Sequence, residues 1–182
     1  VYDRTNNIYS LALAKDKLQE DDTLLIESDL IFDDGMFRLL VDNPYPNLAL
    51  VAKYESWMDG TMVRIDRDNN IVNFVPKAAF DYKETDSYYK TVNIYKFSKG
   101  FSQTKYVPFL DAYTKAVGNN EYYENVLRII SFLNSHDLKA LPIELAELHG
   151  DIHDVMLAAY APVETALSSM LFDGWPKSAL WA

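Results

Sequence analysis

The sequence predicts an α/β domain built on a mixed, mostly parallel sheet with an antiparallel hairpin inserted into it. Two observations support this prediction. An apolar run at 23–29, a helical segment at 33–40 and a second apolar run at 48–53 follow the order typical of a parallel βαβ unit. Apolar and polar residues then alternate on both sides of the turn-rich tetrad 67–70, as they do in a β-hairpin with strands 62–66 and 71–75.

The first elements follow from local patterns. Apolar residues recur at helical spacing after Asn6 or Thr5, either of which can cap the helix, and this predicts a helix over 6–18. The run at 23–29 is nearly continuous in apolar residues before its terminal acids, so we expect a buried strand with Asp29 at its carboxyl end.

The later elements are predicted in the same way. Tyr, Val, Thr and Ile enrich 88–97, which indicates a strand, and helices are expected over 101–117 and 120–134, separated at Gly118. A last strand is expected at 138–143. Beyond it the composition shifts to Ala, Leu and Met, and 152–172 is helical in pattern apart from Pro162. We therefore divide the chain into 1–143 and a divergent helical segment, 144–182.

Composition excludes several classes of function. The chain has 182 residues, 17 basic and 27 acidic, for a net charge of −10, so it lacks the basic surface of a nucleic-acid binder. No apolar run reaches the roughly 20 residues that span a bilayer. The absence of cysteine leaves the cytoplasm as the default location. The six glycines are never closer than 18 residues apart, so no two can form a phosphate-binding loop.

Asp29 is the first candidate for chemistry. Ligands of open α/β sheets gather outside the carboxyl ends of strands, and Glu27 is close by in sequence. A carboxylate in this place suits Mg²⁺, which shares its coordination with substrate phosphates. A solvated acid at the end of a strand explains the same residue without a metal.

Two aromatic and acidic stretches form a second set of candidates. Trp57 and Asp59 lie in a turn beside Gly60, and the sequence Glu121-Tyr122-Tyr123-Glu124 opens a predicted helix. Aromatic faces beside carboxylates attract ammonium groups. A turn that covers the core and acids that complement the helix dipole are the simpler explanations.

Lys90 is the best available partner for a phosphate, and it lies on the predicted strand that also carries Asn93. An ordinary lysine at the end of a strand would need no such role. His149 and His153 are four residues apart and have Asp151 between them, but the zincin pattern is not met, and a surface cluster at a helix start accounts for them.

Five stretches in the same order resemble the sugar-phosphate nucleotidyltransferase superfamily, and within it the phosphocholine and phosphonate cytidylyltransferases. They are NNIYSL at 6–11, LIESD at 25–29, WMDGT at 57–61, KTVNIYKFS at 90–98 and NEYYE at 120–124. The resemblance covers about residues 2–143. It implies a GT-A or Rossmann-like fold and transfer of a nucleotidyl group to an acceptor phosphate with release of pyrophosphate. The family's Gly-rich nucleotide loop has no counterpart here, so the resemblance implies a truncated domain.

The resemblance also implies roles for single residues. Asp29 would bind Mg²⁺, and Asp151 would stand in for the family's second metal acid, since the family's terminal acidic motif is replaced here by AELHGD at 146–151. Asp29 and Lys90 would be the catalytic residues. The acceptor would be bound by Trp57, Asp59, Asn93, Glu121, Tyr122 and Tyr123.

The function expected from the sequence is therefore Mg²⁺-dependent transfer of a nucleotidyl group, cytidylyl by preference, to phosphocholine, a related phosphorylated amino alcohol or a phosphonate. The partners would be a nucleoside triphosphate and the small acceptor. Two alternatives remain. One is a non-catalytic remnant that acts through self-association. The other is a GT-A glycosyltransferase, which is weakened because Glu27 and Asp29 form an E-x-D and not a D-x-D pair.

Overall fold

The computed structural model describes residues 4–28, 30 and 34–143, and its centre is a sheet of six strands in the order β4-β3-β5-β2-β6, with β1 also paired to β5. The strands are β1 (Thr23–Ile26), β2 (Leu48–Lys53), β3 (Met62–Ile65), β4 (Ile71–Val75), β5 (Tyr89–Phe97) and β6 (Lys139–Ile143). The helices are α1 (Asn7–Leu13), α2 (Lys15–Leu18), α3 (Asp34–Val41), α4 (Lys99–Phe101), α5 (Val107–Ala116) and α6 (Glu124–Leu133), with a π-helical turn at Ser102–Tyr106 and 3₁₀ turns at Lys77–Ala79, Thr85–Ser87 and Ser135–Asp137.

The mixed α/β fold is confirmed, but the strand pairing differs from the mostly parallel sheet that the sequence predicts. Among the described strands, only the β2–β6 pair is parallel, and the β1–β5, β2–β5, β3–β5 and β3–β4 pairs are antiparallel. β1 and β2 do run in the same direction, as the βαβ pattern predicts. They are not neighbours, because β5 lies between them and pairs with both. Local sequence order gives strand direction but not which distant strand is inserted.

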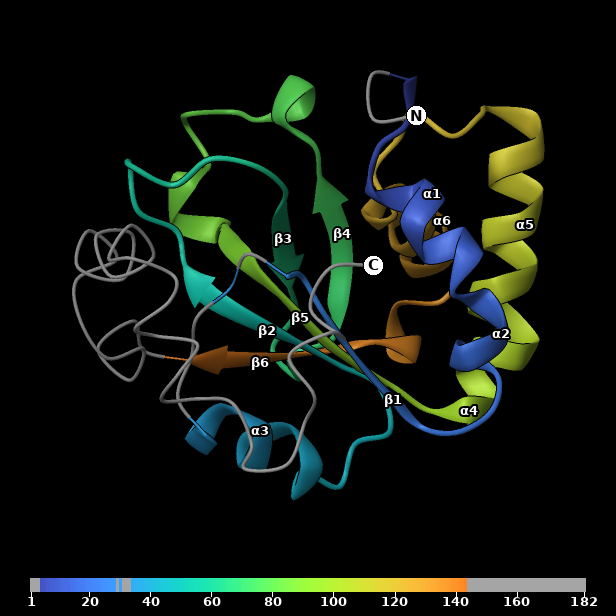
Figure 1. Ribbon diagram of the computed structural model, residues 1–182. Helices are drawn as coiled ribbons and strands as arrows, with labels where there is room; N and C mark the ends of the chain where they lie inside the picture. The colour runs from blue at the N-terminus through green and yellow to red at the C-terminus, as the bar shows by residue number, and fades with distance from the viewer. Residues whose placement is uncertain (1–3, 29, 31–33, 144–182) are drawn as a thin grey trace, which may run out of the picture.

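Helices cover both faces of this sheet, and the burial of β2 follows from that. Leu48 and Leu50 pack on α3 on one face, whereas Ala49 and Val51 join the larger core on the other. In Figure 1, α3 lies below the sheet and α1, α2, α5 and α6 lie to its right. β2 is therefore the buried strand with a continuous apolar run. β1 is only half-buried and ends at Ile26, so the expected buried strand 23–29 is corrected in both length and burial.

Most element boundaries agree with the sequence, and the exceptions have local causes. The helix expected over 6–18 is broken at Ala14 into α1 and α2, although Asn6 caps α1 as expected by accepting a hydrogen bond from the backbone of Asn7. The helix expected from 120 begins at Glu124, since 120–123 form the turn that follows Gly118 at its positive φ of 116°. The segment 144–182, including the helix expected over 152–172, lies outside the described residues.

The hairpin β3–β4 links two edges of the sheet. β3 pairs with β5 only at Met62 and Val63, after which the hairpin crosses behind the strands β2 and β5 in Figure 1. Its turn reaches the start of β6, where Asn70 forms an antiparallel bridge with Lys139.

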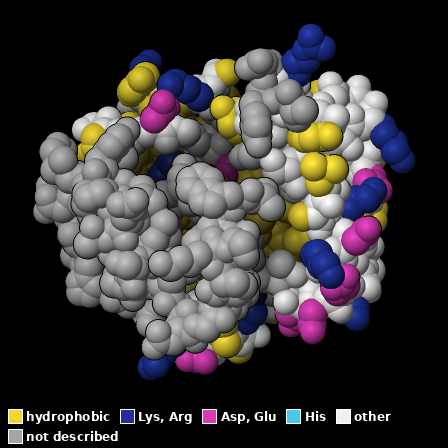
Figure 2. Space-filling view, in the orientation of Figure 1, with side chains coloured by type: hydrophobic (Ala, Val, Ile, Leu, Met, Phe, Trp, Pro, Cys, Tyr) yellow, Lys and Arg dark blue, Asp and Glu magenta, His cyan; other side chains and the backbone are white. Residues whose placement is uncertain are grey.

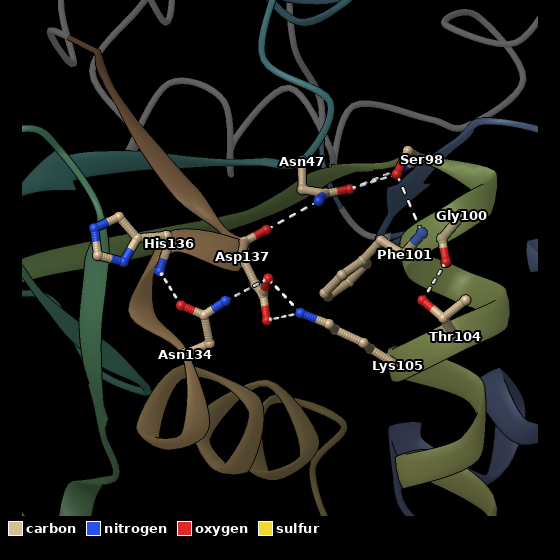
Figure 3. A network of polar contacts seen from close by, with 9 residues as sticks. All are labelled: Asn47, Ser98, Gly100, Phe101, Thr104, Lys105, Asn134, His136 and Asp137. Atoms are coloured by element: carbon tan, nitrogen blue, oxygen red, sulfur yellow. Dashed lines mark hydrogen bonds and ion pairs between the residues drawn. The ribbon is translucent and has the colours of Figure 1, made fainter.

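A polar network holds the start of β6 against the helices (Figure 3). The Asp137 carboxylate pairs with Lys105 and accepts a hydrogen bond of 3.0 Å from the side chain of Asn134. The backbone carbonyl of Asp137 accepts from Asn47 at 2.9 Å, and the Asn47 side-chain oxygen accepts from the backbone and hydroxyl of Ser98. The carboxylate and the backbone carbonyl of Asp137 thus both have partners, and the network ties β6, β2 and the helix that follows β5 together.

Candidate functional site

Polar side chains from four separate segments meet at the carboxyl end of β1, and Glu27 lies at their centre. The Glu27 carboxylate accepts hydrogen bonds from the Asn7 side chain at 3.2 Å, the Asn93 side chain at 2.8 Å and the Tyr123 hydroxyl at 3.1 Å. These donors come from the start of α1, the middle of β5 and the residue before α6. Three neutral donors therefore fix the position of a single carboxylate.

Asn93 reaches Glu27 because β5 is irregular at this point. Its φ is +60°, a left-handed backbone conformation that a non-glycine residue seldom adopts. Along β5, Asn93 lies between the residues that pair with β3 and those that pair with β1. These two strands share one side of β5, and Asn93 falls in the gap between them. Unusual backbone of this kind gathers at functional sites.

Lys90 lies on the same strand and is poorly solvated. Its ammonium donates to the backbone oxygen of Thr91 at 2.7 Å and to the Thr91 hydroxyl at 3.3 Å. Burial lowers the pKa of Lys90, while the nearby charges of Glu124, Glu27 and Asp59 oppose this by favouring the ammonium form. Lys90 is thus influenced by the charges of three acids but forms no salt bridge within 4.0 Å with any of the described residues.

The turn that carries Gly60 approaches Lys90 closely. Gly60 has a φ of +101°, and a Cβ at this position would lie 3.4 Å from Cε and 3.5 Å from Nζ of Lys90. Glycine therefore meets two requirements at once, the left-handed backbone and the close approach.

Glu124 is the most deeply buried acid of the site. It is 5% exposed, and its Oε2 has no hydrogen-bond partner among the described residues. Burial raises the pKa of the Glu124 carboxyl, and the neighbouring charge of Glu27 raises it further, against the opposing hydrogen bond from its own backbone N–H and the charge of Lys90. A carboxylate left without a full set of donors in this position is unusual for a group with a purely structural role.

Of the aromatic residues expected to form a box around an amine, one is buried in the structure and two are exposed. Tyr123 is 2% exposed and donates its hydroxyl hydrogen bond to Glu27, so it is a buried residue that holds this carboxylate in place. Trp57 and Tyr122 are each 55% exposed, and the Trp57 ring nitrogen donates to Glu55 at 2.8 Å. Glu121 accepts from the Asn125 side chain at 2.9 Å.

Asp59 is held in an exposed ion pair. It forms an ion pair of 2.7 Å with Lys77, and that contact lowers the pKa of Asp59 and raises the pKa of Lys77. Tyr82 and Tyr122 add smaller contributions that also raise the pKa of Lys77. In the part of Figure 2 that is not grey, acidic and basic side chains lie interspersed along the right side, next to groups of hydrophobic side chains.

Both residues expected to bind metal, Asp29 and Asp151, lie outside the described residues, and so do His149 and His153. Within the described part of the chain, no group of three His, Asp or Glu side chains is placed to hold a metal ion. Both oxygens of Glu27 already accept hydrogen bonds, which leaves this carboxylate a weak candidate for a ligand.

Four residues of the site received no role of their own from the sequence: Asn7, Glu27, Thr91 and Glu124, the last of which was named only as the end of the candidate stretch 121–124. Asn7 and Glu124 stand at helix starts, where a polar residue is expected in any case. Glu27 was noted only as a neighbour of Asp29. The available signal was that all four fall inside the stretches that carry the resemblance.

Comparison with known proteins gives relatives of one kind, although no family model matches the chain. A CMP-5'-(3-aminopropyl)phosphonate synthase from Streptomyces rubellomurinus (strain ATCC 31215) is 27% identical over 124 residues, which are 66% of this chain and 19% of that protein. The solved CTP:phosphocholine cytidylyltransferase of Streptococcus pneumoniae matches with a TM-score of 0.58 at 19% identity, over 79% of this chain and 56% of that one. The chain has the nucleotidyltransferase fold.

Two further solved structures agree with this. The inositol-1-phosphate CTP transferase of T. maritima has a TM-score of 0.58 at 15% identity, with 88% of this chain and 64% of that chain covered. A putative glucose-1-phosphate thymidylyltransferase from Bacillus anthracis, solved with a sucrose, has a TM-score of 0.56 at 15% identity, over 87% and 62%. The resemblance to nucleotidyltransferases found in the sequence is confirmed. The nucleotidyltransferase-like chain spans about a fifth of the curated relative and under two thirds of these structures.

None of the helices in the described part of the chain has the length and hydropathy of a membrane span.

Proposed function

We propose that this chain carries the acceptor-binding part of a nucleotidyltransferase, which transfers a cytidylyl group from CTP to a small acceptor that bears both a phosphate or phosphonate and an amine. The observation that carries the proposal is the mixed charge at the carboxyl end of β1, where Lys90 is influenced by Glu124, Glu27 and Asp59. An acceptor with one anionic and one cationic end matches a lysine surrounded by acids. The names of the similar proteins, an aminopropylphosphonate synthase and a phosphocholine cytidylyltransferase, support the same class.

The reaction requires little from the protein beyond position and charge. An oxygen of the acceptor phosphate or phosphonate attacks the α-phosphorus of the nucleotide, one new P–O bond forms, and the bond to the β-phosphate breaks so that pyrophosphate leaves. Both reactants are anionic, so a fixed positive charge between them lowers the barrier. Lys90 supplies that charge in this proposal. Its low solvation strengthens each interaction that it makes.

The other residues position the acceptor. Glu27 is held by Asn7, Asn93 and Tyr123, so its charge stays in one place when a ligand binds. Trp57 and Tyr122 provide exposed aromatic faces for the amine. Asp59 would exchange its ion pair with Lys77 for one with the ammonium group of the acceptor.

Magnesium remains part of the proposal, with Asp29 as its ligand and Asp151 as the second acid. Both acids lie outside the described residues, and the described part of the chain contains no group of three His, Asp or Glu side chains that could hold the ion. When bound, the ion would neutralise charge on the phosphates.

Acceptor binding is the first experiment, because it depends only on the described site. Isothermal titration with phosphocholine, 3-aminopropylphosphonate, choline and inorganic phosphate would compare the wild-type chain with Lys90→Met and with Lys83→Met, an exposed lysine outside the site. We expect the two zwitterions to bind more tightly than choline or phosphate, and Lys90→Met alone to weaken them. Equal binding by all four compounds would contradict the proposal.

Turnover is the second experiment. Pyrophosphate release is measured with Mg²⁺ and phosphocholine across CTP, UTP, ATP and GTP, with Asp29→Asn as control. Release with CTP that is lost in Asp29→Asn is the expected result. Binding without release with any nucleotide, together with a defined oligomer in light scattering, would favour the alternative of a non-catalytic relative that self-associates.

A further inference from the structure

A pocket of about 450 Å³ lies where the β3–β4 turn meets the start of β6. Its lining includes Tyr45, Arg67, Asp68, Asn70, His136 and Lys139. Glu27 follows the carboxyl end of β1, whereas Lys139 opens β6 at the amino end of the parallel strands. The two sites are therefore at opposite ends of the sheet, and the proposed function uses none of these residues.

The fold forms this pocket without a ligand. The Asp66 carboxylate accepts hydrogen bonds from the backbone of Asp68 at 2.9 Å and of Asn70 at 2.8 Å, which fixes the turn. The backbone of Ala140 donates to the oxygen of Asn69 at 2.8 Å and thereby attaches the turn to β6. A site held by backbone hydrogen bonds on two strands is preorganised, so binding costs little conformational entropy.

The pocket is lined by two permanent cations, Arg67 and Lys139. Neither Arg67 nor Lys139 forms a salt bridge within 4.0 Å among the described residues. The Lys139 ammonium donates to the backbone oxygen of Asp68 at 2.8 Å and lies 4.6 Å from the centroid of the Tyr45 ring. Figure 3 shows the ring of His136 directed away from the network around Asp137. Two acids are nearby: Asp68 in the lining, and Asp66, whose carboxylate is bonded to Asn70 and interacts electrostatically with His136, so Arg67 and Lys139 are the cations left for a ligand.

Asn70 gives a second and independent indication of a ligand. It is 2% exposed, and its side-chain nitrogen donates to the Asp66 carboxylate at 2.8 Å, which fixes the orientation of the amide. Its Oδ1 then has no hydrogen-bond partner in the described part of the protein. Buried acceptors are nearly always satisfied, and a hydroxyl of a ligand would be a suitable donor to this oxygen.

We propose that this pocket binds the phosphate group of a small phosphorylated molecule that also carries a hydroxyl. Arg67 and Lys139 neutralise the phosphate, with His136 as a further donor, and the hydroxyl donates to Oδ1 of Asn70. The volume is in the range of small-molecule sites, about 300–1,000 Å³, and exceeds the needs of a bare phosphate ion.

The test uses the 182-residue chain labelled with ¹⁵N and two probes, glycerol 3-phosphate and inorganic phosphate. We expect saturable shifts in the amide resonances of 67–70, 136 and 139, with glycerol 3-phosphate binding more tightly than phosphate. The double variant Arg67→Gln/Lys139→Gln should weaken both probes by at least about tenfold. Lys115→Gln, which removes an exposed charge on α5, should leave both unchanged.

Two results would overturn the proposal. The first is the absence of saturable shifts at these residues, or shifts that the double variant leaves as they are in a folded protein. The second is equal affinity for glycerol 3-phosphate and inorganic phosphate. It would show that no hydroxyl of the ligand donates to Asn70.

Discussion

Two polar clusters, one around Glu27 and one around Asp137, use similar side chains to opposite effect. Asp137 has a cationic partner in Lys105, and its carboxylate and backbone carbonyl both accept hydrogen bonds. Glu27 is surrounded by neutral donors, while the cation of its cluster, Lys90, forms no direct ion pair. The first cluster is balanced within the protein, as a structural network is. The second leaves charge available for a ligand.

The backbone differs in the same way. The Asp137 cluster stands on regular capping interactions, with Asn134 and Ser98 as N-caps of the segments that follow them. The Glu27 cluster requires a positive φ at Asn93 and at Gly60 and leaves Oε2 of Glu124 without a partner. The comparison indicates that the protein accepts strain and desolvation around Glu27 that it avoids around Asp137. The following predictions test that difference.

Removal of the unpaired charge should have the largest effect, and it should act on binding. We expect Lys90→Met to weaken phosphocholine binding by tenfold to a hundredfold, equivalent to about 1.4–2.7 kcal/mol. The free energy of unfolding should change little or rise, because a poorly solvated charge is removed. Titration calorimetry and urea denaturation of the same variant measure both. A large loss of stability with unchanged binding would mean that Lys90 is structural.

Removal of the paired charge should act on stability instead. Asp137→Ala deletes the partner of Lys105 and the acceptor of Asn134, so we expect a loss of about 2 kcal/mol in the free energy of unfolding. Phosphocholine binding should be unaffected in the folded fraction. Urea denaturation provides the measurement, and a variant as stable as the wild type would contradict the assignment.

The strained turn offers a matched pair of glycine variants. Gly60→Ala should cost about 1 kcal/mol and also weaken acceptor binding, because its Cβ would meet Lys90 and its φ is +101°. Gly100→Ala lies in α4 with open space around its Cβ, and it should raise stability by up to about 1 kcal/mol. Thermal unfolding of the two variants side by side is decisive. Equal effects would show that the approach of the turn to Lys90 has no consequence.

The smallest effect concerns Glu124 and depends on pH. Its pKa in the folded state is raised above the ordinary value of 4.5, so the folded protein favours the protonated form more than the unfolded chain does. The charged form therefore destabilises the protein as pH rises through and above 4.5, and the penalty is complete once pH exceeds the folded pKa. Glu124→Gln should be more stable than the wild type near pH 7, by about 1 kcal/mol, and this advantage should disappear below pH 4.5.

Urea denaturation of both proteins at a series of pH values checks this prediction. A constant difference across the series would show that Glu124 does not titrate differently in the two states.

The sequence by itself determined the local elements. The alternation around 67–70 predicted the hairpin, the apolar run of β2 predicted a strand with its observed boundaries, and Asn6 was one of the two candidate caps, with Thr5. These features depend on neighbours in the chain, which is why local patterns report them. The motifs also indicated the nucleotidyltransferase fold and three residues of the Glu27 cluster, Lys90, Asn93 and Tyr123.

Only the tertiary structure decided which strands pair and which charges meet. β5 enters between β1 and β2 from more than 35 residues further along the chain than β2, as the pairing of Ala52 with Lys90 shows. No local pattern records such a contact. Glu27, Lys90 and Glu124 are separated by at least 34 residues in sequence, and their burial and mutual electrostatics exist only once the sheet and α6 have formed. From the sequence, Glu124 is therefore an ordinary acid at a helix start, whereas in the fold it is buried and has a raised pKa and an oxygen without a hydrogen-bond partner among the described residues.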